Sequence, residues 1–120
     1  NTPLNAACSD GDIKIVKLLL QNGAHINPQG EHFNTPLSAA CSGNNIKIVE
    51  LLLQNGANIN LQGKDSDTPL RSVCSRGHIK IVELLLQNEA DVNLQGNYAD
   101  TPLRLACSRS DIKIVELLLQ

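Results

Sequence analysis

Aromatic side chains are nearly absent from this sequence: its 120 residues include one phenylalanine, one tyrosine and no tryptophan or methionine. The core must therefore be built from Leu, Ile, Val, Ala and Cys. Runs of eighteen apolar residues are missing as well, so we expect no membrane insertion. The sequence does not open on a charged and then apolar leader, and we therefore expect no signal peptide.

The chain also lacks an excess of positive charge and any paired cysteines. Its formal net charge is −2 and its pI is about 5.9, which argues against a general nucleic-acid binder. The four cysteines lie one in each 33-residue period, which is not a disulfide framework. Asn-x-Ser/Thr sites are absent. We therefore expect an intracellular protein, cytoplasmic or nuclear, with reduced thiols.

What the chain has in quantity is repetition. Ile-Lys-Ile-Val-Glu-Leu-Leu-Leu begins at Ile46, Ile79 and Ile112, and a near copy with Lys17 in place of glutamate begins at Ile13. Thr-Pro-Leu recurs with the same 33-residue period, at Thr2, Thr35, Thr68 and Thr101. Self-similarity at a fixed period indicates one supersecondary unit stacked along an axis.

Each unit is predicted to form two helices followed by a loop. Thr35 is a good N-cap, and Pro36 suits the first position of a short helix. A second helix then carries apolar side chains at helical spacing, and we expect these and their equivalents to be buried: Ile46, Val49, Leu52 and Leu53. Gly56 ends this helix in the left-handed conformation. One unit alone cannot bury its apolar face, whereas stacked copies can.

These units resemble the ankyrin repeat. Thr35-Pro36-Leu37, Ala40 and the stretch from Gly56 to Asn60 match the family's Thr-Pro-Leu-His-x-Ala start and Gly-Ala-x-x-Asn ending. The resemblance covers the whole chain and implies an all-α solenoid of helix-turn-helix units joined by hairpin-like finger loops. It also implies a concave face of short inner helices that, with the fingers, binds other proteins.

The resemblance predicts a single domain over residues 1–120, with repeats of approximately 1–29, 30–62, 63–95 and 96–120. The first and last repeats are incomplete, as expected for a fragment of a longer array or an engineered one. Asn5, Ser38, Arg71 and Arg104 replace the motif histidine.

Several turn positions depart from the family pattern. Asn44 and Ser110 stand where Gly11 and Gly77 separate the two helices of other repeats. Glu89 replaces the glycine that ends the second helix. A left-handed glutamate there would cost roughly 1 kcal/mol relative to glycine.

Candidate catalytic and metal-binding groups form no constellation. The cysteines occupy equivalent points of helices about 8–10 Å apart, whereas a disulfide needs Cα atoms closer than about 7 Å. We expect all four to be small buried apolar residues. The histidines, His25, His32 and His78, lack the spacing of metal ligands. We therefore expect no metal, no cofactor and no enzymatic activity.

Residues that break the repetition are the candidates for binding. All four arginines lie in the inner helices of the last two repeats: Arg71, Arg76, Arg104 and Arg109. Arginine suits the recognition of carboxylates at interfaces. The alternative is pairing within the protein, since Asp67 and Asp100 each lie four residues before an arginine. Arg76 and Arg109 have no acid at that offset.

The finger loops supply the other candidates. Phe33 and Tyr98 resemble the aromatic anchors of protein interfaces, unless each packs on its neighbouring finger. His32 and Asp65 lie in the same loops and complete the candidate set. We therefore predict a monomeric, non-enzymatic module that binds a protein or peptide, acidic and with an apolar anchor. The acidic fingers would repel nucleic acid. The alternative is a structural spacer within a longer array, with no ligand of its own.

Overall fold

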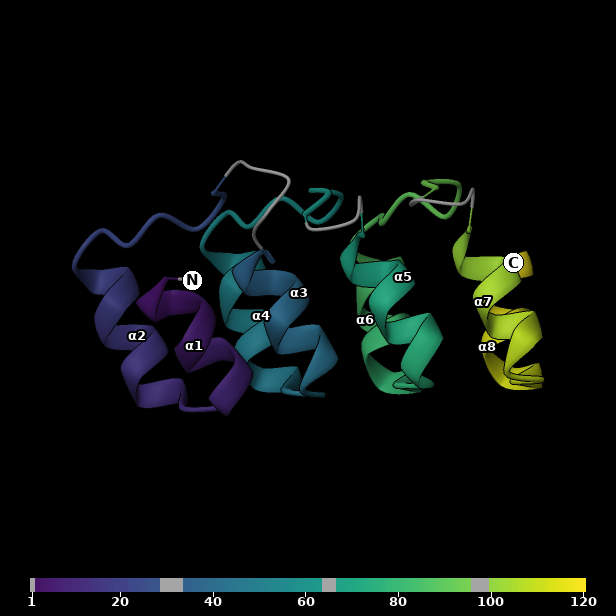
Figure 1. The fold of residues 1–120 in the computed structure, drawn as a ribbon, viewed down its shortest axis with the longest axis horizontal. Coiled ribbons are helices and arrows are strands. Elements are labelled where there is room, and N and C mark those ends of the chain that lie inside the picture. Colours follow the sequence, from purple (N-terminus) through teal and green to yellow (C-terminus); the bar gives the residue numbers. More distant parts are fainter. Residues whose placement is uncertain (1, 29–33, 64–66, 96–99) are drawn as a thin grey trace.

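The computed structural model describes residues 2–28, 34–63, 67–95 and 100–120, and within these ranges it consists of helices without strands. The helices are α1 (Pro3–Asp10), α2 (Ile13–Gln21), α3 (Pro36–Ser42), α4 (Ile46–Gln54), α5 (Pro69–Arg76), α6 (Ile79–Gln87), α7 (Pro102–Ser108) and α8 (Ile112–Leu119). They form antiparallel pairs stacked along the long axis of a molecule that measures 40 × 26 × 22 Å (Figure 1). The predicted all-α solenoid is confirmed.

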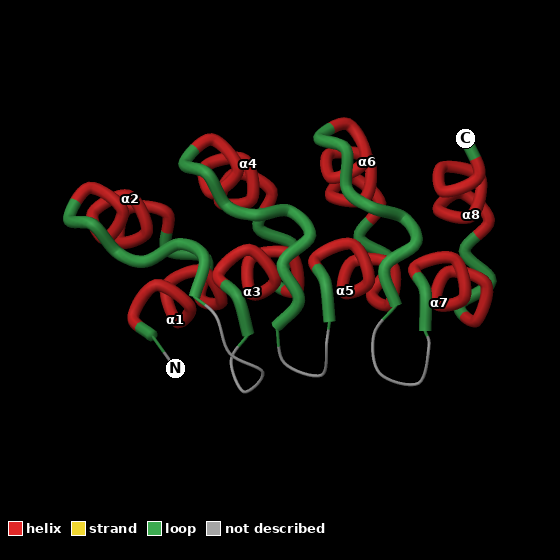
Figure 2. The backbone as a smooth tube through the Cα atoms, turned by 90° about the horizontal axis from the view of Figure 1, so that it is seen from above, coloured by secondary structure: helices red, strands yellow, loops and turns green. Residues whose placement is uncertain are grey.

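The odd-numbered helices form an inner row and the even-numbered helices an outer row (Figure 2). Each inner helix packs on the next inner helix, and each outer helix on the next outer helix. None of the helices in the described part of the chain is long and apolar enough to cross a membrane. Residues in the three finger tips lie outside the described ranges, so the predicted hairpin form of the fingers stays a prediction.

The inner helices begin as the sequence predicts. In each one the threonine before the proline accepts a hydrogen bond from the backbone N–H three residues later, and the proline takes the first turn. A left-handed residue follows each of these helices: Gly11, Asn44, Gly77 and Ser110, with φ of 77°, 57°, 75° and 56°. The chain reverses direction at this residue. Asn44 and Ser110 adopt the left-handed conformation that glycine usually takes, although each carries a side chain.

The outer helices end in a second left-handed turn. Gly23 and Gly56 have φ of 83° and 89°, and Glu89 adopts the same conformation with φ of 65°. The predicted left-handed glutamate is therefore confirmed. The asparagine before each of these residues donates its side-chain amide to the carbonyl four residues back, at 2.8 Å in each case. The same carbonyl also accepts from the backbone N–H of that asparagine, so the side-chain bond reinforces the end of the helix.

The core lies between the two rows of helices. The predicted set of buried residues on the outer helices is only partly right. Val49 and Leu52 are fully buried as expected, but Ile46 and Leu53 are only half-buried. Ile48, which was not predicted, is 2% exposed. An outer helix packs on its own inner helix and also on the preceding outer helix, so its apolar face is wider than one stripe. Ile15, the equivalent residue in the first repeat, is 47% exposed, since no other outer helix covers that side of α2 in the described part of the chain.

Asparagine side chains link successive repeats. The Oδ1 atom of Asn27 accepts from the backbone N–H of Asn58 at 2.7 Å, and Oδ1 of Asn60 accepts from that of Asp91 at 2.8 Å. The two bonds are equivalent, one linking the loops after α2 and α4 and the other the loops after α4 and α6. These bonds fix the register of the stack close to the fingers.

Candidate binding face

The C-terminal ends of the inner helices carry a row of exposed positions whose charge changes along the stack. Asp10, Gly43, Arg76 and Arg109 occupy equivalent places at or just after the last turn of α1, α3, α5 and α7, and all four are exposed. Repeat one is acidic here, repeat two is uncharged, and repeats three and four are basic. We call the exposed arginines of the last two repeats, Arg76, Arg104 and Arg109, the basic patch.

Arg71 does not belong to this patch. It is 8% exposed, its Nη1 lies 2.6 Å from Oδ1 of Asp67, and its Nε donates to the carbonyl of Asp100 at 2.7 Å. Of the two alternatives that the sequence left open, the structure supports pairing within the protein. The Nε and Nη1 donors of Arg71 are therefore engaged within the protein, by the carbonyl of Asp100 and the carboxylate of Asp67, and its part in partner binding stays a prediction.

The same position explains why the family's motif histidine is replaceable. Asn5 donates its side-chain amide to the carbonyl of Asn34, as Arg71 does to Asp100, so each side chain ties its repeat to the start of the next. Ser38 is buried but too short for that reach, and its Oγ has no partner in the described part of the chain. The bond to the next repeat therefore needs a side-chain donor of sufficient length, which Asn5 and Arg71 supply and Ser38 does not.

Asp67 is held in a partly enclosed setting. Burial raises the pKa of its carboxyl group, and the charge of Arg71, the backbone N–H of Thr68 and the charge of Arg76 each lower it. The carboxylate accepts from both Arg71 and Thr68, at 2.6 and 3.0 Å. Both bonds go to Oδ1, so this oxygen is committed to the fold, and the charge of Arg71 offsets that of Asp67 beside the basic patch.

Arg104 and Arg76 are available to a partner. The side chain of Arg104 is 66% exposed, and its Nη1 lies 3.2 Å from Oδ1 of Asp100. An exposed ion pair of this kind is worth only about 0–1 kcal/mol, so a partner's carboxylate can replace Asp100 at small cost. Arg76 is exposed and makes no hydrogen bond or ion pair within the described ranges. Its guanidinium is therefore the least committed of the patch.

Arg109 has a second role that the sequence did not predict. Its Nη1 donates to the carbonyl of Ser75 at 3.3 Å, and its guanidinium lies so close over Gly77 that a Cβ there would be 2.6 Å from Nη2. The free carbonyls at the end of α5 thus receive a donor from the next repeat. The bond is long and exposed, so it restrains Arg109 only weakly.

The other repeat junctions obtain this donor from a different position. Asn45 donates from Nδ2 to the carbonyl of Cys8 at 3.1 Å, and Nε2 of His78 lies 3.3 Å from the carbonyl of Ser42. The equivalent residue of the fourth repeat, Asp111, has no donor and accepts from Ile114 as an N-cap. The sequence does carry a signal for this role of Arg109. Asp111 has no donor at the position where Asn45 and His78 stand, so at this junction the bond comes from another side chain.

The cysteines follow the prediction in three repeats and depart from it in the fourth. Cys8, Cys41 and Cys74 are fully buried, and burial raises the pKa of the Cys8 and Cys74 thiols to about 12 and that of Cys41 further. Cys107 is exposed, so its predicted burial is wrong, because α5 covers one side of α7 and no described inner helix covers the other. Within the described ranges no group of three His, Cys, Asp or Glu side chains could hold a metal ion.

Half of the predicted site lies where the structure gives no description. Phe33, Tyr98, His32 and Asp65 are outside the described residues, so their part in binding stays a prediction.

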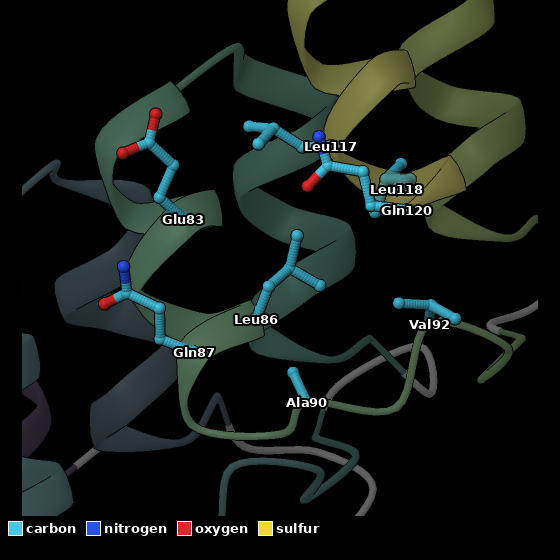
Figure 3. A pocket seen from close by; sticks show the side chains of 8 residues that line it. All are labelled: Glu83, Leu86, Gln87, Ala90, Val92, Leu117, Leu118 and Gln120. Atoms are coloured by element: carbon cyan, nitrogen blue, oxygen red, sulfur yellow. The ribbon is translucent and has the colours of Figure 1, made fainter.

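A pocket that the sequence did not predict opens between the outer helices α6 and α8 (Figure 3). Its volume is about 580 Å³, and Leu86, Ala90, Val92, Leu117 and Leu118 supply its apolar lining.

A comparison with known protein families agrees with this geometry. The family model described as ankyrin repeats, in three copies, matches residues 1–63 and 57–120. No curated protein matches the chain. The two matches together span all the stacked helix pairs, including the caps and left-handed turns described above. The chain therefore belongs to the ankyrin repeat family, whose members are generally non-enzymatic modules of protein–protein interaction.

Proposed function

We propose that this chain is a non-enzymatic module that binds an acidic protein or peptide segment through the basic patch of its inner-helix face. The observation that carries the proposal is the state of Arg76 and Arg104. One is exposed without a partner in the described residues, and the other is held only by an exposed ion pair. Both therefore retain donors that a carboxylate can accept, and arginine presents them in a planar fork.

The spacing of the patch suggests the form of the partner. Neighbouring inner helices lie about 10 Å apart, so Arg76 and Arg109 are separated by about that distance along the stack. A peptide in the polyproline II conformation advances about 3.1 Å per residue with three residues per turn, so carboxylates three residues apart lie on the same side of it and match this separation. A segment with acidic residues at positions i and i+3 thus fits the patch.

Our proposal also covers the kind of partner, the location of the protein and the alternative function. Net charge near −2 and the carboxylates of Asp10, Asp100 and Asp111 disfavour a nucleic-acid partner. Free cysteines at one per repeat are consistent with a reducing, intracellular location, cytoplasmic or nuclear. The alternative function, a structural spacer without a ligand of its own, requires only the stacking contacts and leaves the basic patch without a role.

The test uses a panel of fluorescein-labelled synthetic peptides with two glutamates and one leucine, measured by fluorescence anisotropy. One set spaces the glutamates three residues apart, a second set two apart, and a third replaces them by lysine. We expect binding of the first set to exceed that of the others and to weaken as salt is added. Each lost charge-assisted bond is worth about 1.5–3 kcal/mol, so Arg76→Ala with Arg104→Ala should weaken binding by at least tenfold.

The matched control changes two lysines on the outer helices, Lys80→Ala with Lys113→Ala. Both are exposed, and their loss alters net charge by the same amount as the loss of two arginines. Equal weakening in both double variants would show general charge attraction and no specific patch. Failure of every acidic peptide to bind would favour the spacer alternative.

A further inference from the structure

The turns that end the first two outer helices contain the dipeptide Asn-Gly. The chain has two such pairs, Asn22-Gly23 and Asn55-Gly56, and both lie within the same local sequence, Leu-Leu-Leu-Gln-Asn-Gly-Ala. The third outer helix ends in Asn88-Glu89 instead. In all three turns the asparagine and the residue after it are exposed to solvent. The asparagine amide is therefore accessible to water in each turn, and only the residue that follows it differs.

An asparagine followed by glycine can be converted to an acid by its own backbone and water. The backbone nitrogen of Gly56 loses its proton and attacks Cγ of Asn55, a C–N bond forms, and Nδ2 leaves as ammonia. The product is a five-membered succinimide ring, which one water molecule opens to aspartate or isoaspartate. Glycine favours the attack because it has no Cβ beside the attacking nitrogen, whereas Glu89 carries one.

The folded turn holds Asn55 in a conformation that prevents this attack. Its Nδ2 donates to the carbonyl of Leu51 at 2.8 Å, and the backbone N–H of Gly56 donates to the carbonyl of Leu53 at 3.2 Å. The leaving group and the attacking nitrogen are thus both bonded to the helix. Closing the ring also requires rotation about the Cα–C bond of Asn55, whose ψ is 17°. The turn must therefore open before the reaction occurs.

The neighbouring repeat holds the same turn from outside the helix. Nδ2 of Asn27 donates to the carbonyl of Gly56 at 3.0 Å, and Oδ1 of Asn27 accepts from the backbone N–H of Asn58 at 2.7 Å. Gly56 and Asn58 are thus the points at which the first repeat is bonded to the loop of the second. Opening of the turn displaces both groups, so the contact between the two repeats protects Asn55.

The product of the reaction does not fit the turn that the asparagine occupied. An aspartate at this position has no amide to donate to Leu51, and its negative charge lies at the C-terminal end of a helix, where the helix dipole disfavours it. Isoaspartate adds a methylene group to the backbone directly before Gly56 and shifts the carbonyl that Asn27 binds. Either product loosens the end of α4 and its link to the first repeat.

From these contacts we propose that Asn55-Gly56 is a self-modification site that reacts with water, closed by the folded turn and opened when the end of α4 frays from the first repeat. Helix ends and loops open locally more often than the whole chain unfolds. Each opening allows reaction, and each reaction makes the next opening easier. The site therefore converts a transient opening of the stack into a lasting one, and it does so independently of the basic patch.

Peptide mapping by mass spectrometry at neutral pH measures the conversion of each amide. We expect Asn55 to react at least about tenfold more slowly in the folded chain than in guanidinium chloride, which corresponds to about 1.4 kcal/mol of protection. In the unfolded chain Asn88 should react far more slowly than Asn55, and Glu89→Gly should make the two rates equal. Equal rates for Asn55 in the folded and unfolded chains would overturn the closed site. An Asn88 that stays slow in unfolded Glu89→Gly would overturn the chemistry.

A pair of asparagine variants tests the role of the neighbouring repeat. Asn27→Ala removes both bonds to the turn and should speed the reaction of Asn55 in the folded chain severalfold. Asn60→Ala is the matched control, because it removes the equivalent bond to the backbone N–H of Asp91 at the next junction. It should leave the rate at Asn55 unchanged. Equal rates in the two variants, with circular dichroism showing that both are folded, would rule out protection by the first repeat.

A second pair of variants tests the effect of the product. Asn55→Asp reproduces one product and should lower the midpoint of urea unfolding. Gln54→Glu adds the same charge at the preceding exposed position and leaves the amide bond from Asn55 to Leu51 in place. Its midpoint should therefore fall less. If the two midpoints fall equally, the lost amide bond does not loosen α4, and the proposed effect of the modification is wrong.

Discussion

Replacing Glu89 by glycine should stabilise the protein, and the size of the effect follows from one backbone angle. Glu89 ends the third outer helix with φ of 65°, where Gly23 and Gly56 occupy the equivalent places in the first two repeats. Its side chain is exposed and makes no hydrogen bond or ion pair among the described residues. The substitution therefore removes strain at the backbone without breaking a contact.

Two opposing terms set the magnitude. A Cβ in the left-handed conformation costs roughly 1–2 kcal/mol, and this strain is relieved. Glycine loses more conformational freedom on folding, which costs about 0.5–1 kcal/mol. The net gain is about 0.5–1 kcal/mol. For a chain of this length, that corresponds to a rise in melting temperature of about 2–5 °C.

Urea unfolding followed by circular dichroism measures the change, as an increased midpoint with an unchanged slope. Gly56→Ala is the reciprocal control, because the conformation is the same, with φ of 89°, and an added Cβ meets no atom within 4 Å. It should lower stability by a similar amount. If Gly56→Ala is destabilising and Glu89→Gly is not stabilising, the glutamate side chain contributes a bond that offsets its strain, and the reasoning from backbone strain alone is wrong.

Three further changes separate structural residues from surface residues. Arg71→Ala should cost about 2–3 kcal/mol because it leaves Asp67 and a carbonyl without their donor, whereas Arg104→Ala should stay within about 0.5 kcal/mol in the same urea titration. Leu52→Ala should cost about 2–5 kcal/mol, and a loss below 1 kcal/mol would contradict its burial. Above pH of about 9, stability should fall by up to about 1.4 kcal/mol per pH unit for each buried thiol. The unfolded thiols ionise there, while the pKa of Cys74 is raised to about 12, so Cys74→Ala should make the slope shallower; an unchanged slope would contradict this.

Local signals in the sequence sufficed for the ends of the helices. A threonine followed by proline starts each inner helix, and a left-handed residue at a glycine position follows each helix from α1 to α7, even where it is Asn44, Glu89 or Ser110. Such features depend on atoms within about one helical turn. The family pattern supplied the stacking of the units, because a period of 33 residues with one apolar face has few other ways to bury it.

The burial of side chains between repeats could not be predicted from the sequence of a single repeat. Arg71 and Arg104 both follow an aspartate by four residues, yet one is 8% exposed and the other has a side chain that is 66% exposed. Cys74 and Cys107 differ in the same way. The local sequence is equivalent in each pair, and what differs is whether another repeat packs alongside. Position in the stack therefore decides which arginine supports the fold and which stays exposed.

The donors at the junctions show how binding and folding become linked in such a stack. Each junction places one side-chain donor on the carbonyls at the end of the preceding inner helix, and the supplier changes from Asn45 to His78 to Arg109. In the fourth repeat the usual position holds Asp111, which caps its own helix, so the supplier is an arginine of the candidate binding face. A carboxylate that engages Arg109 must compete with the carbonyl of Ser75, whereas one that engages Arg76 competes with no such bond in the described residues. Recognition through the patch should therefore rest first on Arg76 and Arg104, and a partner that also recruits Arg109 would loosen the last repeat from the third.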